Sequence, residues 1–436
     1  MSNTSTSLRL LSTSLLSFAG PTGESTTTNA LDVLDSPVGP ANDNEVPENA
    51  TAKLSLTPTP HRLTRRSFLM ASGALLLGAT AGLLSGCGEA GISQDSAPAT
   101  RLTTDMAGRE VEIPATVSKV YSTGQPGVVA LYMLAPEKLL GWCMKPSAAE
   151  SEYLLPDYLD LPVYGLMQGQ NNTANREVIV EQAPDFILLM TALAHDSYRQ
   201  EATEDAAAIE RAMNIPVVVV DYSLNTAGQA LRYLGELLGS PERAEELAAY
   251  CEDVYTDALA KAATIPEDSR VTVYYAQGQT GLQTAPQGSS HSEVIDLVGG
   301  DNVAKLDFGS GGRVNVDMEQ VLLWNPQVVI TSYAMSHNVD GDEVFRLIEE
   351  GNRSWAEITA IQERRVYNTP SYPYNWQDMP PSINRFMGIT WLGNLLYPKV
   401  FVCDIRQKTK EFYRLFYQIE LSEEQVDKLL RNAVAR

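Results

Sequence analysis

Short apolar runs alternate with amphipathic helical patterns along most of the chain after Arg101, and this alternation restricts the fold more than any other feature. Strands separated by helices in this way form parallel sheets with helices packed on their faces. The sequence therefore predicts an α/β fold with parallel sheets. The predicted strands span residues 119–122, 139–142, 186–190, 216–221, 271–276, 328–331 and 365–368.

A long helical stretch divides this alternating pattern into two halves. Between Leu224 and Ala263, apolar residues recur at helical spacing, with an interruption at Gly239–Pro241. We interpret the stretch as two consecutive helices or one kinked helix that forms a stiff connector. The predicted parts are an N-terminal lobe at 101–222, the helical connector at 223–265, and a C-terminal lobe with terminal helices at 266–436.

The segment that precedes the alternating pattern carries signals for export. Residues 1–60 are rich in Ser, Thr, Asn and Pro, which predicts a disordered extension. Residues 61–86 contain Arg65-Arg66 followed by an apolar run to Leu84, the arrangement of a signal peptide. The arginine pair resembles a twin-arginine signal, but Met70 stands where Lys is usual, so the export route stays open.

The apolar run ends in Leu84-Ser85-Gly86-Cys87, which resembles the bacterial lipobox. The resemblance implies that Cys87 carries the lipid and that residues 87–100 form a flexible tether. No later stretch reaches the roughly 18 apolar residues that a membrane-spanning helix requires. We therefore expect an extracytoplasmic protein held by a lipid anchor at the outer face of the cytoplasmic membrane.

Charge and short motifs exclude several classes of function. The net charge of −22 argues against nucleic acid, which binds basic surfaces. The four cysteines (Cys87, Cys143, Cys251, Cys403) form no CxxC pair, so no zinc or redox motif is indicated. The last three are interpreted as packed or free thiols, with a disulfide left open. The chain also lacks GxSxG and HExxH, which favours a binding protein without a cofactor over an enzyme.

The two halves of the chain contain a similar segment, at 175–189 and 317–331. Each has a Glu (Glu177, Glu319), a short amphipathic helix, a Pro seven residues after the Glu and a buried strand. Helix–Pro–strand turns are common in α/β proteins, so the similarity also fits two unrelated turns. A true repeat instead predicts two lobes of related structure.

Together with three further motifs, these features resemble the periplasmic-binding family that serves importers of siderophores, haem and cobalamin. The resemblance covers about residues 101–400. It implies two Rossmann-like lobes bridged by a long helix, with the ligand cleft between them. The motifs are an opening hairpin at 103–114, a helix and Gly-Gly turn at 289–303, and a cleft loop at 374–382.

The resemblance also gives a role to the repeated glutamates. It implies that Glu177 and Glu319 project from the two lobes and contact arginines of an ABC permease that works with an ATPase. The alternative is local, because an acidic residue near the start of a helix is favoured by the helix dipole.

Candidate ligand contacts lie in the loops after the strands, since ligands of open α/β sheets bind beyond the carboxyl ends of strands. Aromatic candidates offer apolar contact, and the guanidinium of Arg313 offers paired donors for an anionic group. Core packing and a surface ion pair are the respective alternatives. A loop His or Tyr is also a candidate metal ligand. The candidates are Tyr121, Gln125, His195, His291, Arg313, Tyr333, Tyr374 and Trp376.

The sequence thus predicts a monomeric solute-binding protein that captures a bulky, anionic metal chelate such as a ferric siderophore, haem or corrinoid. The alternatives are an oxyanion or a free divalent metal as ligand, and an extracellular enzyme built on the same lobes.

Overall fold

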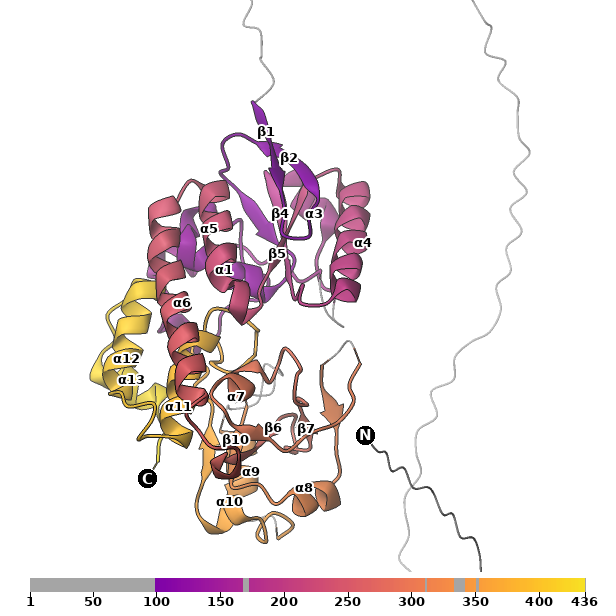
Figure 1. Cartoon of the computed structure of the whole chain (residues 1–436). Coiled ribbons are helices and arrows are strands. Elements are labelled where there is room, and N and C mark those ends of the chain that lie inside the picture. The colour runs from indigo at the N-terminus through magenta and orange to yellow at the C-terminus, as the bar shows by residue number, and fades with distance from the viewer. Residues whose placement is uncertain (1–98, 168–171, 310–311, 333–341, 350–352, 436) are drawn as a thin grey trace, which may run out of the picture. The chain divides into compact units, whose positions relative to one another are not determined.

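Two α/β lobes joined by a long helix make up the part of the chain that the computed structural model describes (Figure 1), namely residues 99–167, 172–309, 312–332, 342–349 and 353–435. The predicted extension, the signal peptide, Cys87 and nearly all of the tether lie outside these residues, as does Tyr333. Within them, the predicted α/β class with parallel sheets is confirmed.

The first lobe is built on a parallel sheet of order β3-β4-β5. Strands β4 and β5 are nearly continuous apolar runs, as expected where helices cover both faces of a sheet. Alternate side chains of β4 and β5 pack toward α1 on one face and toward α4 on the other. The elements are β3 (Val120–Ser122), α1 (Gln125–Leu134), β4 (Phe186–Thr191), α4 (Asp196–Met213) and β5 (Val217–Asp221).

Two other segments frame this lobe. The opening hairpin pairs β1 (Thr100–Thr104) with β2 (Glu110–Pro114) in antiparallel fashion. The prediction of a strand at 139–142 is wrong, because Leu139 makes a single bridge to Val120 and Trp142 makes one to Val163. The chain therefore leaves the sheet edge after a single pairing instead of running along it.

The second lobe has a parallel sheet of order β11-β10-β6-β8 and a small antiparallel pair, β7-β9. The side of the sheet that carries Tyr274 and Val329 packs against α8, α9 and α10. The elements are β6 (Thr272–Ala276), β7 (Gln283–Thr284), α7 (Glu293–Leu297), β8 (Asp301–Asn302), β9 (Val314–Asn315), α8 (Met318–Trp324), β10 (Val328–Thr331), α9 (Glu343–Glu349), α10 (Thr359–Gln362) and β11 (Val366–Asn368).

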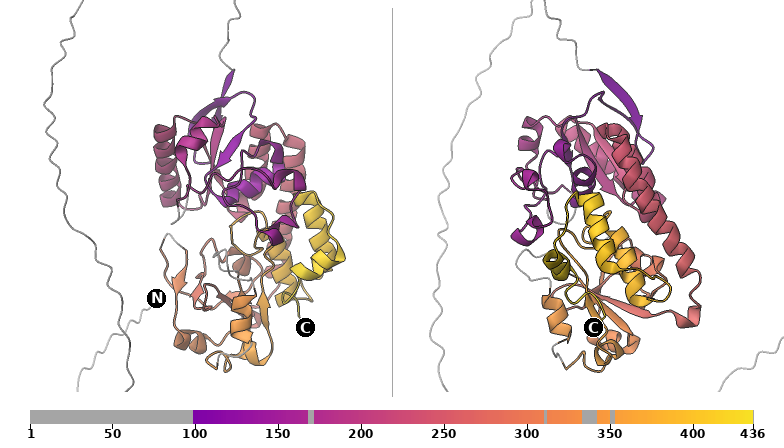
Figure 2. Two further views of the ribbon diagram at one scale, coloured as in Figure 1. Left: turned by 180° about the vertical axis from the view of Figure 1, so that it is seen from behind. Right: turned by 90° about the vertical axis from the view of Figure 1, so that its left-hand side faces the viewer.

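The helical stretch between the lobes forms two helices, α5 (Ala227–Leu238) and α6 (Pro241–Ala262). Gly239 ends α5 in a left-handed conformation with φ of 68°, and Pro241 opens α6. Helix α5 packs on the first lobe, whereas α6 runs from that lobe down to the second (Figures 1 and 2).

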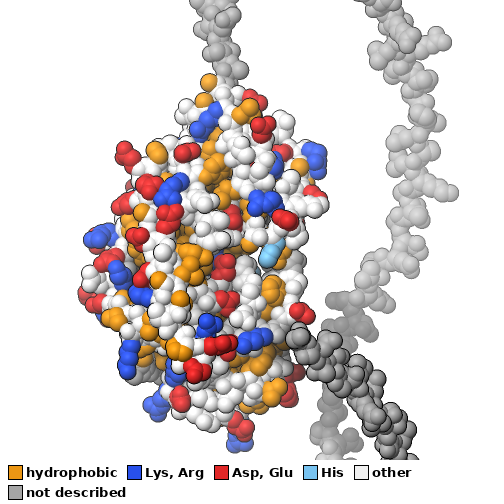
Figure 3. All heavy atoms as spheres, in the orientation of Figure 1, with side chains coloured by type: hydrophobic (Ala, Val, Ile, Leu, Met, Phe, Trp, Pro, Cys, Tyr) orange, Lys and Arg blue, Asp and Glu red, His pale blue; other side chains and the backbone are white. Residues whose placement is uncertain are grey.

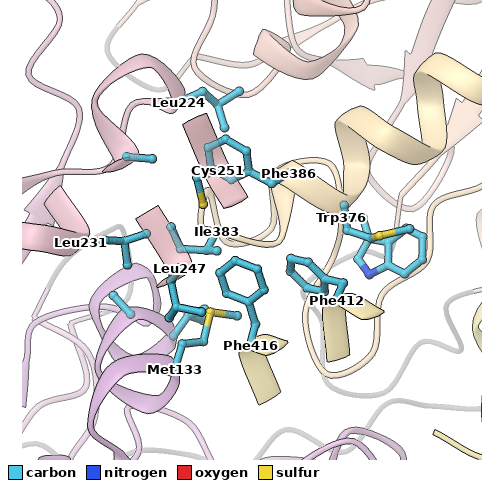
Figure 4. Close-up of a cluster of buried hydrophobic side chains, with 14 of the residues drawn as sticks. Met133, Leu224, Leu231, Leu247, Cys251, Trp376, Ile383, Phe386, Phe412 and Phe416 are labelled. Atoms are coloured by element: carbon cyan, nitrogen blue, oxygen red, sulfur yellow. The ribbon is translucent and has the colours of Figure 1, made fainter. Parts of the chain in front are cut away.

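The C-terminal helices pack against both lobes and join their cores. Phe412 and Phe416 lie with Met133 of α1 and Leu247 of α6 in one buried apolar cluster (Figure 4). The same region includes the ion pair between Lys428 and Glu152 of the first lobe, at 2.9 Å. Because the lobes share one core, relative motion between them requires repacking of this cluster. The helices are α11 (Arg385–Leu396), α12 (Ile405–Phe412), a π-helical segment (Tyr413–Tyr417) and α13 (Glu423–Leu429).

The state of the cysteines, the length of the helices and the distribution of surface charge complete the description of the fold. Cys143, Cys251 and Cys403 are free thiols. None of the helices in the described ranges is both long and apolar enough to cross a membrane. On the face shown in Figure 3, acidic and basic side chains are interspersed, without a continuous basic surface of the kind that nucleic acid requires.

Candidate functional site

A pocket of about 790 Å³ is lined by residues of both lobes. The first lobe contributes the loops after β4 and β5 and one side of α4, and the second lobe contributes Gly288, Ser290, Glu293, Phe308 and Gly312. In the first lobe the pocket therefore lies at the carboxyl ends of parallel strands, the usual position of a ligand in open α/β sheets.

The loop after β4 brings a predicted ligand residue to this pocket. His195 directly precedes α4, has an extended backbone and is exposed at the pocket wall. Its ring makes an edge contact with Tyr198, at 5.3 Å between centroids. The structure thus places His195 where the sequence predicted it, beside an aromatic residue of the first turn of α4.

The loop after β5 supplies two pocket residues that the sequence analysis did not single out. Tyr222 and Ser223 follow β5 directly and line the pocket. The buried carboxylate of Asp221 positions this loop, because its Oδ1 accepts from the Ser223 hydroxyl at 2.7 Å and from the Leu193 amide at 3.1 Å. The predicted strand at 216–221 could have identified these residues, because ligands of open α/β sheets bind just beyond the carboxyl ends of strands.

The wall of the second lobe is made of two loops that lock together. The Ser289 hydroxyl donates to the Gly312 carbonyl at 2.7 Å, and Gly288, Ser290 and Gly312 line the pocket. Gly312 has φ of 61°, and a Cβ there would lie 2.8 Å from Cδ2 of His291. Only glycine fits this close approach between the loops.

Arg385 joins the two lobes by contacting one pocket-lining residue of each, Tyr222 and Glu293. Its side chain is fully buried and donates to the backbone carbonyl of Tyr222 in the first lobe and to the carboxylate of Glu293 in the second. The guanidinium also lies 5.6 Å from the centroid of the Tyr222 ring. Burial raises the pKa of Tyr222, and the neighbouring Arg385 partly opposes that rise. Tyr222 therefore stays a neutral phenol at the pocket wall.

A buried carboxylate organises a second polar group behind the wall of the second lobe. Oδ2 of Asp378 lies 2.7 Å from Nη2 of Arg313 and 2.9 Å from Nδ1 of His291, and Oδ1 accepts from the Tyr275 hydroxyl at 2.6 Å. Burial alone would raise the pKa of Asp378, but Arg313 and these hydrogen bonds hold it well below its usual range. The structure thus brings the predicted residues Arg313 and His291 together through Asp378, which the sequence analysis did not single out.

Two aromatic candidates lie in the core instead of the pocket. Trp376 has no exposed surface, and its indole N–H donates to the Tyr413 hydroxyl at 3.3 Å within the cluster of Figure 4. Tyr121 is equally buried and donates to the Gly165 carbonyl at 2.8 Å. The prediction of these rings as ligand contacts is corrected, because the C-terminal helices and the 164–165 turn enclose them.

The remaining ligand candidates do not line the pocket either. Tyr374 is half-buried beside the shared core, and burial raises its pKa far above the ordinary value. Gln125 at the start of α1 contacts the sulfur of Met144 at 3.2 Å. Both side chains are used for packing between neighbouring segments of the protein.

The repeated glutamates occupy matching places in the two lobes. Glu177 is exposed in α3 (Arg176–Glu181) and Glu319 is exposed in α8. In each helix the residue two positions before the Glu caps the N-terminus. The side chain of Asn175 accepts from the Val178 amide at 3.3 Å, and that of Asp317 accepts from the Gln320 amide at 2.8 Å. In Figure 1, α3 and α8 lie to the right of α6, one on each lobe. Leu323 on α8 is also 79% exposed.

Comparison with known proteins gives a family match for the central half of the chain. Residues 150–373 match the family model described as periplasmic binding protein. The chain is 24% identical to the molybdate-binding protein MolA of Haemophilus influenzae, over 74% of this chain and 92% of MolA. It is 22% identical to the uncharacterised ABC transporter substrate-binding lipoprotein YvrC of Bacillus subtilis, over 75% of this chain and 96% of YvrC.

A solved structure has the same fold over nearly its whole length. An ABC transporter solute-binding protein from Sulfurospirillum deleyianum superimposes with a TM-score of 0.67 and 29% sequence identity. The match covers 76% of this chain and 99% of that protein. The two lobes and the connector are thus the part of the chain that is shared.

Proposed function

Because the chain belongs to the periplasmic binding protein family and is a solute-binding component of an ABC transporter, we propose that its solute is a metal chelate held in the pocket between the lobes. The chelate class includes ferric siderophores, haem and corrinoids. The observation that carries this proposal is the size and composition of the pocket.

The pocket has room for a ligand much larger than an inorganic ion. Its volume of about 790 Å³ falls within the roughly 300–1,000 Å³ of pockets that hold drug-sized molecules. A tetrahedral oxyanion has a volume only a few times the ~30 Å³ share of one water in the liquid, so it would fill a small part. Tyr198, Tyr222 and Phe308 give the wall the aromatic surface that an organic chelator contacts.

The charges of the wall refine the expected ligand. Among the described lining residues, Glu201, Asp205 and Glu293 are acidic and Arg176 is basic. Arg385 neutralises Glu293, so Glu201 and Asp205 against Arg176 leave one excess negative charge. This excess of negative charge works against a bare dianion and favours a neutral or cationic chelate over the anionic one that the sequence suggested. No group of three or more His, Cys, Asp or Glu side chains able to hold a metal ion occurs in the described residues, which speaks for a chelator as the main source of metal ligands.

We also propose that the protein is anchored by a lipid at Cys87. The order of the arginine pair, apolar run, Ser85, Gly86 and Cys87 supports this, and the relative YvrC is described as a lipoprotein. The anchor keeps the binding protein near the permease and ATPase of its transporter.

A second candidate is an oxyanion such as molybdate. It is favoured by the similarity to MolA, a molybdate-binding protein. In this case the guanidinium of Arg313 is the cationic group of the second lobe that would donate to the anion.

A thermal-shift panel separates the candidates. Haemin, cobalamin, ferric siderophores, nickel chelates and molybdate are each added to the purified chain, since a ligand that binds the native state raises the melting temperature by mass action. A ligand at 100 times its Kd stabilises by about 2.7 kcal/mol. A shift with a chelate supports the first candidate, and a shift with molybdate alone replaces it with the second.

A matched pair of variants locates the binding site. Ala194→Trp places a large ring at the pocket wall, whereas Glu204→Trp adds the same ring to an exposed position of α4 that does not line the pocket. We expect the first variant to lose the ligand-induced shift and the second to keep it. Equal shifts in both variants would place the ligand elsewhere.

A further inference from the structure

One arm of the pocket extends away from the boundary between the lobes, along α4. The lining residues of this helix run from Tyr198 in its first turn to Ile209, which lies about 16 Å further along at the ~1.5 Å rise per residue of an α-helix. Helix α3 lies beside α4 on the same lobe (Figure 1) and contributes a residue to the opposite rim. This part of the pocket, the α4 arm, is lined by Arg176, Leu189, Glu201, Ala202, Asp205 and Ile209.

The α4 arm combines an apolar floor with a charged rim. Its three apolar lining residues are buried in the core between β4 and α4. Glu201 and Asp205 are exposed on α4, and Arg176 is exposed on α3. A ligand segment that matches this surface has an apolar chain to cover the floor and a charged group that reaches the rim.

The two acidic residues of the rim lack the partners that other carboxylates of α4 have. Glu204 accepts from the side-chain amide of the glutamine four residues earlier, at 2.9 Å, and Glu210 pairs with Arg109 at 2.6 Å. The side chains of Glu201 and Asp205 make no hydrogen bond or ion pair with any residue that the structure describes. They are four residues apart on the helix, so their like charges are neighbours and repel each other. A cation bound between them would remove this repulsion.

We propose that the α4 arm binds an aminoalkyl chain of the captured chelate, with the ammonium group between Glu201 and Asp205 and the methylene groups over the apolar floor. This proposal rests on the proposed function and narrows its ligand class to ferric siderophores that carry a free amine on a flexible chain. Haem is a disfavoured ligand, because its flexible side chains end in carboxylates that the two acidic residues repel.

Arg176 limits where the ammonium group can bind. Its guanidinium makes no hydrogen bond or ion pair with the described residues, and it repels a cation from the α3 side of the arm. One positive charge faces two negative ones, so the arm still favours a cation, on its α4 side. The guanidinium remains free to donate to a carbonyl or hydroxamate oxygen of the chelator.

The test uses ferrioxamine B, a linear ferric trihydroxamate with a free aminopentyl chain, and its N-acetyl derivative, which keeps the metal centre and the chain but carries no charge on it. Calorimetric titration of the full chain measures both affinities. Each exposed ion pair gives an effect of about 1.5- to 5-fold, so we expect ferrioxamine B to bind about 3- to 10-fold more tightly. Raising the salt from about 0.05 to about 0.5 M should reduce this preference by screening. Equal affinities, or no binding of either compound at millimolar concentration, would overturn the proposal.

A matched pair of variants tests the two carboxylates. Glu201→Gln with Asp205→Asn keeps the shape of the rim and removes its negative charges, so we expect the preference for ferrioxamine B to disappear. Glu204→Gln with Glu236→Gln makes the same change in net charge at exposed positions that do not line the pocket, and should keep the preference. Arg176→Gln removes the opposing charge and should increase it. Equal loss of the preference in both double variants would assign it to overall charge and exclude the arm.

This outcome is separable from that of the proposed function. If the two ferrioxamines bind equally, or if neither binds while haemin or cobalamin raises the melting temperature, the proposed function stands and the role of the α4 arm is excluded. If no chelate shifts the wild type, the proposed function itself fails.

Discussion

Arg385 and Tyr222 meet across the boundary between the lobes, with the buried guanidinium donating to the Tyr222 carbonyl and lying 5.6 Å from its ring centroid. The same guanidinium binds Glu293, so one side chain of α11 ties together the pocket walls of both lobes. This bridge and the shared apolar core both oppose wide opening of the pocket.

We expect Arg385→Met to lower the free energy of unfolding by about 3 kcal/mol, because it leaves the partly buried Glu293 carboxylate without its partner. Urea denaturation measures this loss. Arg385→Lys keeps the charge but cannot make the forked contacts, so an intermediate loss is expected. A methionine variant as stable as the wild type would show that the bridge contributes little.

Trp376→Ala is expected to act on stability and not on ligand contact. Removing this buried ring leaves a cavity in the shared core, with a typical cost of about 3–5 kcal/mol. Tyr413→Phe removes only the hydrogen bond to the indole and should cost about 1 kcal/mol. Calorimetric titration of folded Trp376→Ala with the ligand is the decisive measurement. A large loss of affinity would show that Trp376 contacts the ligand.

Asp296 predicts a pH-dependent stability. Burial raises its pKa from 3.8 to about 6, against the opposing hydrogen bond from the Gly288 amide, and its Oδ1 has no hydrogen-bond partner among the described residues. The native state therefore holds this proton more tightly than the unfolded chain, and the contribution of Asp296 to stability falls as pH rises from about 4 to 6.

Asp296→Asn removes this titration. We expect it to stabilise the protein by about 1–2 kcal/mol at pH 7.5, where the wild-type carboxylate is charged, and to give no gain below pH 4. Thermal melts across this range measure the difference. Asp307→Asn, at an exposed position, is the control. A gain that is independent of pH would contradict the assignment.

Charge reversal at both repeated glutamates, Glu177→Arg with Glu319→Arg, tests docking to the permease. Exposed ion pairs are individually weak, about 0.2–1 kcal/mol, and act mainly on orientation and encounter rate. We expect solute uptake by cells to fall while ligand affinity and melting temperature stay nearly unchanged. Reversing two other exposed residues, Glu236→Arg with Glu267→Arg, makes the same change in net charge. Normal uptake by the first pair would leave only the helix-dipole role.

Cys87→Ala tests the lipid anchor. Without the thiol no acyl chain can be attached, so we expect the protein to leave the membrane fraction or to remain as an unprocessed precursor. Fractionation and mass spectrometry of the N-terminus measure both outcomes, with Cys403→Ala as the control. Unchanged membrane association of the Cys87 variant would contradict the anchor.

What the sequence by itself determined is local. The apolar runs of β4 and β5, the break between α5 and α6 at Gly239 and Pro241, and the α3 and α8 helices all follow from neighbouring residues. Periodicity, capping and turn chemistry act over a few residues, so the longer apolar strands of both parallel sheets were predicted well. The segment at 139–142, whose partner changes along its length, was predicted wrongly, and the two-residue strands β7, β8 and β9 were not predicted.

Only the tertiary structure decided which side chains face the pocket. Trp376 and Tyr374 belong to a loop predicted to line the cleft, but the C-terminal helices cover that loop and draw the Trp376 ring into the core. Asp378 meets Arg313 across 65 residues of sequence. Such contacts depend on how distant helices and loops pack together, because the same aromatic or charged residue is stable in a core or at a pocket wall according to what covers it.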